Sequence, residues 1–258
     1  MMVAFMFAIV MNFITYWFSD KIVLMMYKAQ PAKEEEVPAV YRIVRDIAAK
    51  AKLPMPKIYI IPIQTPNAFA TGRDAKHAVV AVTRGLLEKL EKSELEGVIS
   101  HELSHIGNKD MLLQTIVVVL VGIVAILSNF FLRISFFGGG RRRDSRDSGG
   151  AILAIFGILA AFLAPIAATL IQLAISRKRE FLADASGALL TRYPEGLAKA
   201  LEKIAKDPNP LRTANNATAH LYIASPFRGE ERTNWFTKLF MTHPPVEERI
   251  KALREMSV

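Results

Sequence analysis

The sequence predicts a mainly helical α+β protein that is anchored by transmembrane helices. Three stretches, residues 1–19, 111–132 and 149–176, contain no Asp, Glu, Lys or Arg. Each comes close to or exceeds the roughly 20 residues that a helix needs to cross the hydrocarbon core of a bilayer. The stretches 30–110 and 177–258 are polar; the first combines helical periodicity with short β-branched runs, and the second is helical. This pattern predicts a polar α+β domain that is divided by a membrane hairpin.

The composition excludes several classes of protein. The chain has 258 residues, a formal net charge of +9 and a hydrophobic fraction of 52%, which is too apolar for a disordered or fibrous chain. It contains no cysteine, so disulfide frameworks, iron–sulfur clusters, thiolate zinc sites and cysteine nucleophiles are excluded. Any bound metal ion must therefore be held by histidines and carboxylates.

The apolar stretches define the domain organisation. We interpret residues 1–29 as an N-terminal transmembrane helix; a cleaved secretory signal is disfavoured because no basic region precedes the apolar run and no small-residue cleavage site follows it. Residues 111–176 form the predicted transmembrane helical hairpin, with a basic, glycine-rich loop at 138–150. Residues 30–110 and 177–258 are the two parts of the polar domain.

The positive charge does not indicate binding of nucleic acid. Arg141, Arg142 and Arg143 lie in a short loop between apolar helices, and the loop residues 138–150 include no aromatic side chain. Contact with lipid headgroups or simple solvation explains this charge better. We therefore expect membrane lipid as a partner and no nucleic acid.

Two short runs of the first polar part predict strands. Residues 57–63 and 75–83 are rich in β-branched and aromatic residues and are separated by the segment 67–72. Prolines at 62 and 66 predict that these strands are irregular or lie at the edge of a sheet, because proline cannot donate a ladder hydrogen bond.

The remaining elements of the polar parts are predicted to be helices. Apolar residues recur at helical spacing in 40–48 and again in 86–107. The second half of the helix 86–107 is predicted to open on a capping box formed by Ser93 and Glu96. In the second polar part, helices are predicted at 177–190, 194–206 and 245–256.

One motif carries clear chemistry. His101, Glu102 and His105 form the pattern HExxH, which on a helix places both imidazoles on one face, as two corners of a zinc tetrahedron require. Glu102 could then take the proton of a metal-bound water as it attacks a peptide carbonyl. Two surface histidines are the alternative, but Val98 and Ile99 make this helix amphipathic and favour a packed position.

A catalytic zinc ion with two histidines needs a third protein ligand and an open position. Candidates are Glu180, Asp184, His220 and His243. Spacing favours Glu180 and Asp184, because residues one helical turn apart share a face and these two follow the hairpin that returns the chain. One would bind metal while the other holds a ligand imidazole; an ordinary solvated helix face is the alternative. Asp110 could orient an imidazole or could meet solvent.

The sequence resembles the HtpX-type membrane zinc metalloproteases, relatives of the CAAX-prenyl protease. The resemblance covers nearly the whole chain and lies in four motifs that occur in order: NAFATG, ISHELSHIGNKDM, SRKREFLADASGALL and THPPVEERI. It implies a zincin-like (gluzincin) metalloprotease domain and one zinc ion per chain. His101, His105 and Glu180 are implied to bind that ion. Glu102 is implied to be the general base, and Asp184 to support a ligand.

The resemblance assigns roles to three further residues. His243 and Arg249 are implied to face the cleft and to stabilise the tetrahedral oxyanion. From the residues alone, His243 could instead cap the last helix and Arg249 could be a surface guanidinium. Asn67 is implied to begin an edge strand that holds substrate by β-augmentation. The family usually has a further hydrophobic segment ahead of residues 1–19, which predicts that this chain lacks a first span.

The two parts of the site constrain the topology. HExxH and Glu180 must meet at one metal ion, so the chain between them must leave and return on one side, as two spans do. Basic residues flank both ends of the hairpin, so the positive-inside rule does not decide on which side of the membrane the polar domain lies. The resemblance implies a multi-pass protein of the cell membrane with a cytoplasmic catalytic domain, and it also allows a hairpin that does not cross completely.

The leading hypothesis for function is a membrane-embedded zinc-dependent endopeptidase. Its substrates would be unfolded, misfolded or damaged membrane proteins, a class that the resemblance implies. A specific protease for lipidated C-terminal substrates is an alternative from the same relatives. A non-catalytic membrane protein that zinc staples together is disfavoured, because a structural site has no need of a base such as Glu102 and usually fills its fourth position with protein.

Overall fold

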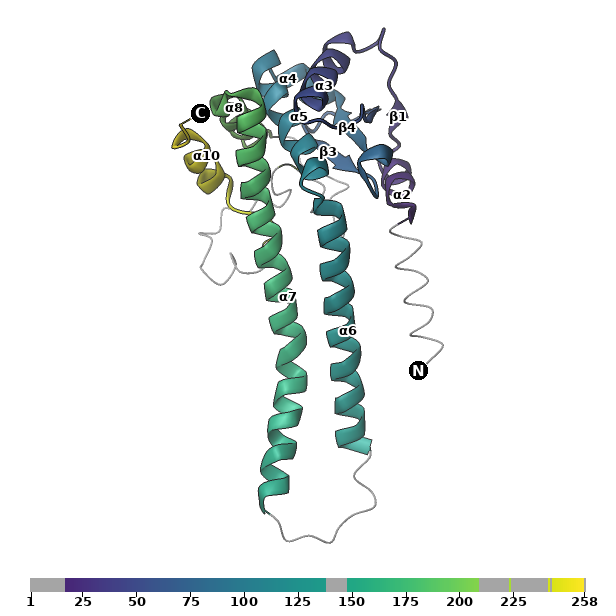
Figure 1. Cartoon of the computed structure of the whole chain (residues 1–258), viewed down its shortest axis with the longest axis vertical. Helices are drawn as coiled ribbons and strands as arrows, with labels where there is room; N and C mark the ends of the chain where they lie inside the picture. Colours follow the sequence, from purple (N-terminus) through teal and green to yellow (C-terminus); the bar gives the residue numbers. More distant parts are fainter. Residues whose placement is uncertain (1–16, 138–147, 209–222, 224–240, 242, 258) are drawn as a thin grey trace.

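The computed structural model describes residues 17–137, 148–208, 223, 241 and 243–257. A head of strands and short helices carries two long helices, α6 (Asp110–Phe137) and α7 (Ser148–Thr191), which extend from it side by side (Figure 1). Residues 1–16, the loop 138–147 and the candidate His220 lie outside the described residues. The mainly helical α+β prediction is confirmed. The shorter helices are α2 (Ser19–Met26), α3 (Pro38–Lys50), α4 (Arg84–Lys89), α5 (Lys92–Gly107), α8 (Pro194–Ala205) and α10 (Val246–Arg254).

A mixed sheet of four strands lies on one side of the head. Its order is β1-β2-β4-β3. At its centre, β2 (Lys57–Ile61) pairs in parallel with β4 (Val79–Thr83). At the two edges, β1 (Gln30–Pro31) pairs antiparallel with β2, and β3 (Ala68–Thr71) pairs antiparallel with β4.

The two predicted strands therefore lie at the centre of this sheet, and the prediction of edge strands from their prolines is wrong. Pro62 and Pro66 follow Ile61, the last residue of β2, so they remove no hydrogen bond from the ladder. The second strand also begins later than predicted, at Val79, because Ala75–His77 form a short 3₁₀ helix.

The segment that separates the two predicted strands forms the edge strand β3, as the resemblance implied. Ala70 lies opposite Val80 in the register, and all four residues of β3 are buried. Gly72 follows the strand with a φ of 127°, and a Cβ at that position would lie 2.3 Å from the carbonyl oxygen of His77. Only glycine fits this turn without displacing the backbone.

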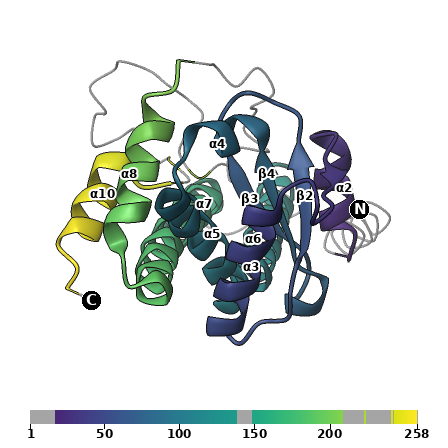
Figure 2. The same cartoon turned by 90° about the horizontal axis from the view of Figure 1, so that it is seen from above.

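Helix α5 passes through the centre of the head and carries the HExxH motif. It packs against β3 and α3 on one side and against α7 and α8 on the other, and Figure 2 shows this arrangement from above. Val98, Ile99 and Leu103 on α5 are fully buried. Because the helix is covered on both sides, its position relative to the sheet and to α7 is fixed by core packing.

The helix predicted at 86–107 is interrupted, since α4 ends before α5 begins. Glu91 is the N-cap of α5 and has an extended backbone conformation. The capping box consists of Glu91 and Glu94, so the prediction of Ser93 and Glu96 is wrong by two residues. The side chain of Glu94 accepts the backbone N–H of Glu91 at 2.8 Å, and a carboxylate on Glu91 takes the acceptor role that a serine hydroxyl usually fills.

Helix α7 is continuous from the apolar stretch into the head. The span predicted at 149–176 and the helix predicted at 177–190 form one helix, because the change in composition at residue 177 brings no glycine, proline or cap to end it. Two segments, Asp110–Leu132 and Gly157–Thr191, are long and apolar enough to cross a membrane. Only 11% and 6% of their most apolar windows are buried within the described protein, so most of their side chains are free to contact lipid.

Candidate metal centre

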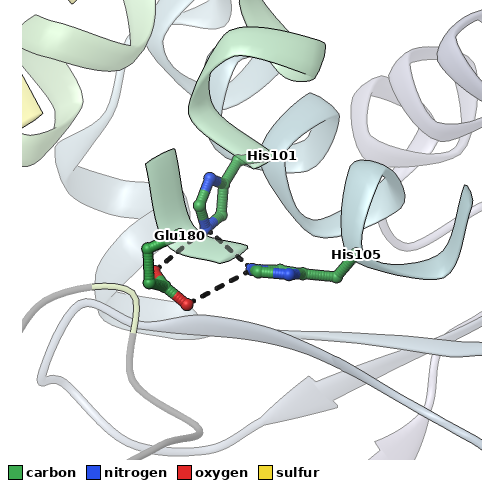
Figure 3. Close-up of side chains that lie close together, drawn as sticks. All are labelled: His101, His105 and Glu180. Carbon is green, nitrogen blue, oxygen red and sulfur yellow. Dashed lines mark hydrogen bonds and ion pairs between the residues drawn. The ribbon is translucent and has the colours of Figure 1, made fainter. Parts of the chain in front are cut away.

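Three potential metal ligands converge where α5 meets α7. His101 and His105 lie one turn apart on α5, with their Nε2 atoms 3.1 Å apart. Glu180 of α7 faces both rings: its Oε1 lies 3.6 Å from Nε2 of His105, and its Oε2 lies 3.7 Å from Nε2 of His101 (Figure 3). The structure thus brings together the three residues that the sequence analysis named as ligands.

Small residues on α7 allow this close contact with α5. Ala183 is fully buried, and one turn further on, a Cβ added to Gly187 would lie 3.0 Å from both the backbone nitrogen of His101 and the Oγ of Ser100. A larger residue at 187 would push the two helices apart. The reach of Glu180 to the histidines therefore depends on these small residues.

The chemistry of the three donors fits a divalent metal ion. Nδ1 of His101 lies 2.8 Å from Asp184, and Nδ1 of His105 lies 2.7 Å from Asp110. A neutral imidazole whose Nδ1 proton is accepted by a carboxylate presents a lone pair on Nε2. Two such nitrogens 3.1 Å apart need a proton or a metal ion between them. Ligands about 2.0–2.1 Å from zinc lie roughly 3.3 Å apart at tetrahedral corners, close to the separations found here.

The charge around the site also favours a cation. Burial opposes protonation of His105, but the hydrogen bond to Asp110 and the charge of Glu180 outweigh burial and raise the pKa of His105 to about 9. The surrounding carboxylates thus attract positive charge to this imidazole. A bound metal ion would replace that proton, as metal binding to histidine generally does.

Asp184, which holds His101, is itself held by Arg249 of α10. The guanidinium donates from Nε and Nη2 to the two carboxylate oxygens at 2.8 and 2.7 Å, and from Nη1 to the carbonyl of Ile223 at 2.5 Å. Arg249 is 0% exposed, so the alternative of a surface guanidinium is wrong. Its Nη1 lies 3.4 Å from Glu180, and its implied role at an oxyanion stays a prediction.

We expect Arg249→Met to destabilise the head by about 3–5 kcal/mol, because the buried carboxylate of Asp184 would lose its partner. The measurement is thermal unfolding of the full chain in detergent. Arg254→Met on the same helix is the control: Arg254 pairs with Glu195 and Glu202 near the surface, so its loss should change the melting temperature little. Equal shifts for the two variants would contradict the expectation.

Glu102, the predicted general base, is buried beside the histidines and strand β3. Its Oε2 accepts the backbone N–H of Ala70 at 2.7 Å, which connects the base to the edge strand. Burial raises the pKa of Glu102 above its ordinary value, although the charges of His101 and His105 oppose this shift. A carboxylate with a raised pKa is a stronger proton acceptor, as the predicted role requires.

His243 lies next to the carboxylate of Glu180. Its Nδ1 is 3.1 Å from Oε2 of Glu180, and the residue is only 3% exposed. The alternative that His243 caps the last helix is wrong, because the N-cap of α10 is Pro245. Arg177 of α7 donates to the carbonyl of Met241 at 2.8 Å, which holds Met241 against the helix that carries Glu180.

We expect His243→Ala to lower kcat roughly a hundredfold or more while the metal stays bound. A donor aimed at the developing oxyanion is worth about 3 kcal/mol, and KM should change little because the contact strengthens in the transition state. Steady-state kinetics on a quenched fluorescent peptide measure both constants. His77→Ala, which removes an exposed imidazole paired with Asp74, is the control. A normal kcat for His243→Ala would leave this residue a structural role.

Asn67 connects the edge strand to Arg249. The residue is 2% exposed; its backbone N–H donates to Oγ1 of Thr83 at 2.9 Å, and its side-chain Oδ1 accepts the N–H of Ile223 at 3.1 Å. The carbonyl of Ile223 in turn accepts a hydrogen bond from Arg249. The implied role of Asn67 in holding substrate stays a prediction.

Some residues at the site were not assigned from the sequence. Of the two interpretations of Asp110, its contact with His105 supports the first, in which it orients the imidazole. Arg177 and Arg179 were not predicted to take part in the site, because a basic run next to an acid is typical of an exposed helix face. Ile223 takes part through its backbone alone, so its side chain gave no signal.

An HExxH helix that meets a glutamate from a second, largely apolar helix defines a class of protein, the membrane metallopeptidases with a zincin-like catalytic domain. Comparison with known proteins leads to the same class. Residues 34–257 match the model of Peptidase family M48. The chain belongs to this family, and it is a membrane metalloprotease that acts on protein substrates.

Curated relatives carry the name Protease HtpX homolog. The protein of Syntrophobacter fumaroxidans is 52% identical over 258 residues, which cover 99% of this chain and 89% of the relative. The protein of Thermococcus kodakarensis is 53% identical over 257 residues, covering 99% and 86%, and that of Pyrococcus furiosus is 52% identical over 260 residues, covering 100% and 87%. The resemblance to HtpX-type proteases is therefore confirmed.

A solved structure also shares the fold. The crystal structure of S. mikatae Ste24p matches with a TM-score of 0.63 and 18% sequence identity, covering 96% of this chain and 57% of that chain. At this identity the likeness shows the fold alone. Together with the family, it confirms the predicted fold class, a zincin-like domain combined with membrane helices.

Proposed function

We propose that the chain binds one zinc ion at His101, His105 and Glu180 and hydrolyses peptide bonds in misfolded or damaged membrane proteins. The observation that carries this proposal is that ligand atoms of these three residues converge where the head joins α6 and α7. The buried Glu102 lies beside them. Two imidazoles and one carboxylate leave a fourth position open, which is typical of catalytic zinc and not of structural zinc.

In the proposed hydrolysis, Glu102, His243 and strand β3 have separate roles. Zinc, when bound, polarises the substrate carbonyl and acidifies a water molecule. Glu102 accepts the proton of the attacking water, a role for which its raised pKa is suited. His243 lies close enough to Glu180 to donate a hydrogen bond to an oxyanion that forms beside the ligands. Strand β3, together with Asn67 just before it, holds the substrate backbone in an extended conformation.

The position of the site supports a membrane substrate class. Asp110 contacts the ligand His105 and is also the first residue of α6, whose apolar stretch begins at the next residue. Glu180 lies on α7 only a few residues beyond the apolar stretch that ends at 176. A polypeptide leaving the bilayer would therefore meet the ligands within a few turns of helix.

The test uses the full chain in liposomes, with Glu102→Gln as the blank. Three substrates are compared: a membrane protein destabilised by mutation, the same protein in its folded form, and a prenylated C-terminal peptide. Faster cleavage of the destabilised protein supports the proposal. Preferred cleavage of the prenylated peptide favours the protease for lipidated C-terminal substrates. No cleavage of any substrate by zinc-loaded protein favours the zinc-stapled, non-catalytic alternative.

We further propose that the chain is a multi-pass protein of the cell membrane whose catalytic head lies in the cytoplasm. Lys109 and Arg177 to Arg179 at the junction of head and helices agree with the positive-inside rule for this orientation, whereas Arg133 and Arg141 to Arg143 at the other end of the hairpin oppose it. The orientation is therefore proposed on the resemblance to the HtpX-type proteases. The absence of cysteine makes a single introduced thiol specific. Glu255→Cys on the exposed end of the head should react with an impermeant maleimide in inverted vesicles and not in right-side-out vesicles; the opposite result rejects this orientation.

A further inference from the structure

The second nitrogen of His105 is held by the first residue of a membrane helix. Nδ1 of His105 lies 2.7 Å from Oδ2 of Asp110, and α6 begins at Asp110. Between them the chain makes a tight turn in which Asn108 N–H donates to the carbonyl of Ser104 at 2.8 Å and Lys109 has a φ of 56°. The end of α5 and the start of α6 are thus joined by one hydrogen-bonded turn.

Arg179 joins this connection to the other membrane helix. Its guanidinium pairs with Oδ1 of Asp110 through Nε and Nη2, and Nη2 also donates to the carbonyl of Asn108 at 2.8 Å. Asp110 is only 4% exposed, and a buried carboxylate needs such a partner. Arg179 precedes Glu180 directly on α7, so the guanidinium that fixes Asp110 and the carboxylate that faces the histidines share one turn of helix.

The two imidazoles have the same kind of support. His101 contacts Asp184, which pairs with Arg249 of α10. His105 is supported in the same way: it contacts Asp110, which pairs with Arg179. The first set ties the site to the last helix of the head, whereas the second ties it to both membrane helices.

We propose that Asp110 and Arg179 are a positioning pair for the metal centre, which orients His105 and sets the spacing of α6 and α7 so that Glu180 stays within ligand distance. The inference rests on the proposed function only in treating His105 as a zinc ligand. A carboxylate on the far nitrogen of an imidazole fixes the tautomer and raises its basicity toward the metal. Arg179 acts through Asp110 and touches neither imidazole.

A simpler view is that the pair is only an ion pair between helices, which stabilises the fold. Zinc affinity separates the two views, and competition with a chromogenic chelator measures it for the full chain in detergent without any substrate. We expect Asp110→Ala to weaken zinc binding about 10–100-fold, the usual effect of losing such a partner. We expect Arg179→Gln to weaken it severalfold to tenfold, although the guanidinium of Arg179 pairs with Asp110 and Asn108 and not with the side chain of a proposed ligand.

Glu94→Gln is the matched control. Like Asp110, Glu94 is a buried carboxylate, 2% exposed; it lies on α5 and pairs with Lys203 of α8 at 2.7 Å. Its loss should lower the melting temperature and leave zinc affinity unchanged. Arg179→Lys keeps the charge but loses the two-donor geometry, so it should bind zinc with an affinity between those of wild type and Arg179→Gln.

The exchange of both residues, Asp110→Arg with Arg179→Asp, gives the sharpest test. It preserves an ion pair between the helices but places a guanidinium against His105. If the pair positions the imidazole, stability recovers and zinc affinity does not. Recovery of wild-type zinc affinity in the exchange variant, or wild-type affinity in both Asp110→Ala and Arg179→Gln, overturns the proposal. If the exchange variant does not fold, the single variants and Arg179→Lys decide.

This measurement stands apart from the proposed function. Wild-type protein that binds zinc but cleaves none of the three substrates would refute the proposed function and leave the affinity comparison valid. Conversely, a normal protease whose zinc affinity is insensitive to Asp110 and Arg179 would refute only the positioning pair.

Discussion

Glu102→Gln is expected to keep its zinc and to lose peptide-bond hydrolysis by on the order of a thousandfold or more. Glutamine has the same shape as glutamate, so its carbonyl oxygen can still accept the N–H of Ala70 that Glu102 accepts at 2.7 Å. His101, His105 and Glu180 are untouched, so the metal site stays intact. The amide cannot accept a proton, so only the base is removed.

Two measurements on one preparation test this expectation: zinc content of the purified protein, and cleavage of casein in detergent. Glu96→Gln is the control, because Glu96 is a half-buried residue of the same helix that lies 3.7 Å from Lys92, and its loss should change neither quantity. Undiminished proteolysis by Glu102→Gln would end the mechanism proposed here. Loss of zinc together with activity would show that Glu102 contributes to the site in some way other than as a base.

The parts of the site that could be predicted from sequence are those fixed by helical spacing. His101 and His105 share a face because they are four residues apart on one helix, and no tertiary information is needed to see it. Glu180 and Asp184 follow from the same spacing together with the requirement that the hairpin return the chain. Spacing could not decide which of the two carboxylates binds the metal and which holds an imidazole, because both lie on the same face of the helix.

Contacts that depend on tertiary packing could not be predicted. Arg179 and Arg249 are both arginines of charged helices, and nothing in their local sequence shows that each is turned inward to a buried carboxylate. Burial makes the difference, because a guanidinium that leaves water must find a paired acid. Ile223 contributes only backbone atoms, which every residue possesses.

The fold shows the same division between local and tertiary information. The apolar stretches predicted α6 and most of α7 because bilayer thickness sets their length. Whether a strand lies at the edge or the centre of a sheet depends on its neighbours. Pro62 led to the wrong prediction of an edge strand because it lies just beyond the end of β2. The composition change at residue 177 looked like a boundary, yet α7 continues through it, since helix termini depend on caps and breakers and not on hydrophobicity.

Continuity of α7 gives the membrane helices a direct path to the metal centre. The helix that carries Glu180 and Arg179 is the same helix that contains the apolar stretch ending at residue 176. Its neighbour α6 begins at Asp110, which holds His105. Any shift of one membrane helix along the other would separate Arg179 from Asp110 and move Glu180 relative to the histidines. The proposed positioning pair therefore predicts that assembly of the metal centre is coupled to packing of α6 against α7.

Glu180→Ala is expected to strip zinc at chelator concentrations that wild-type protein resists, because it removes one of the three proposed protein ligands. Asp184→Ala should weaken zinc binding only about 10–100-fold, since Asp184 contacts the imidazole of His101 at 2.8 Å and is not one of the three proposed ligands. The loss for Glu180→Ala should therefore clearly exceed that for Asp184→Ala.

Competition with a chelator measures both variants, and Glu195→Ala on α8, which removes an acid paired with Arg254, provides the control with unchanged affinity. His220→Ala completes the set, because His220 was the other candidate ligand whose position lies outside the described residues. Release of zinc by His220→Ala combined with retention by Glu180→Ala would mean that the metal is bound by a different set of residues. The separations of 3.6 and 3.7 Å between Glu180 and the two imidazoles predict the opposite result.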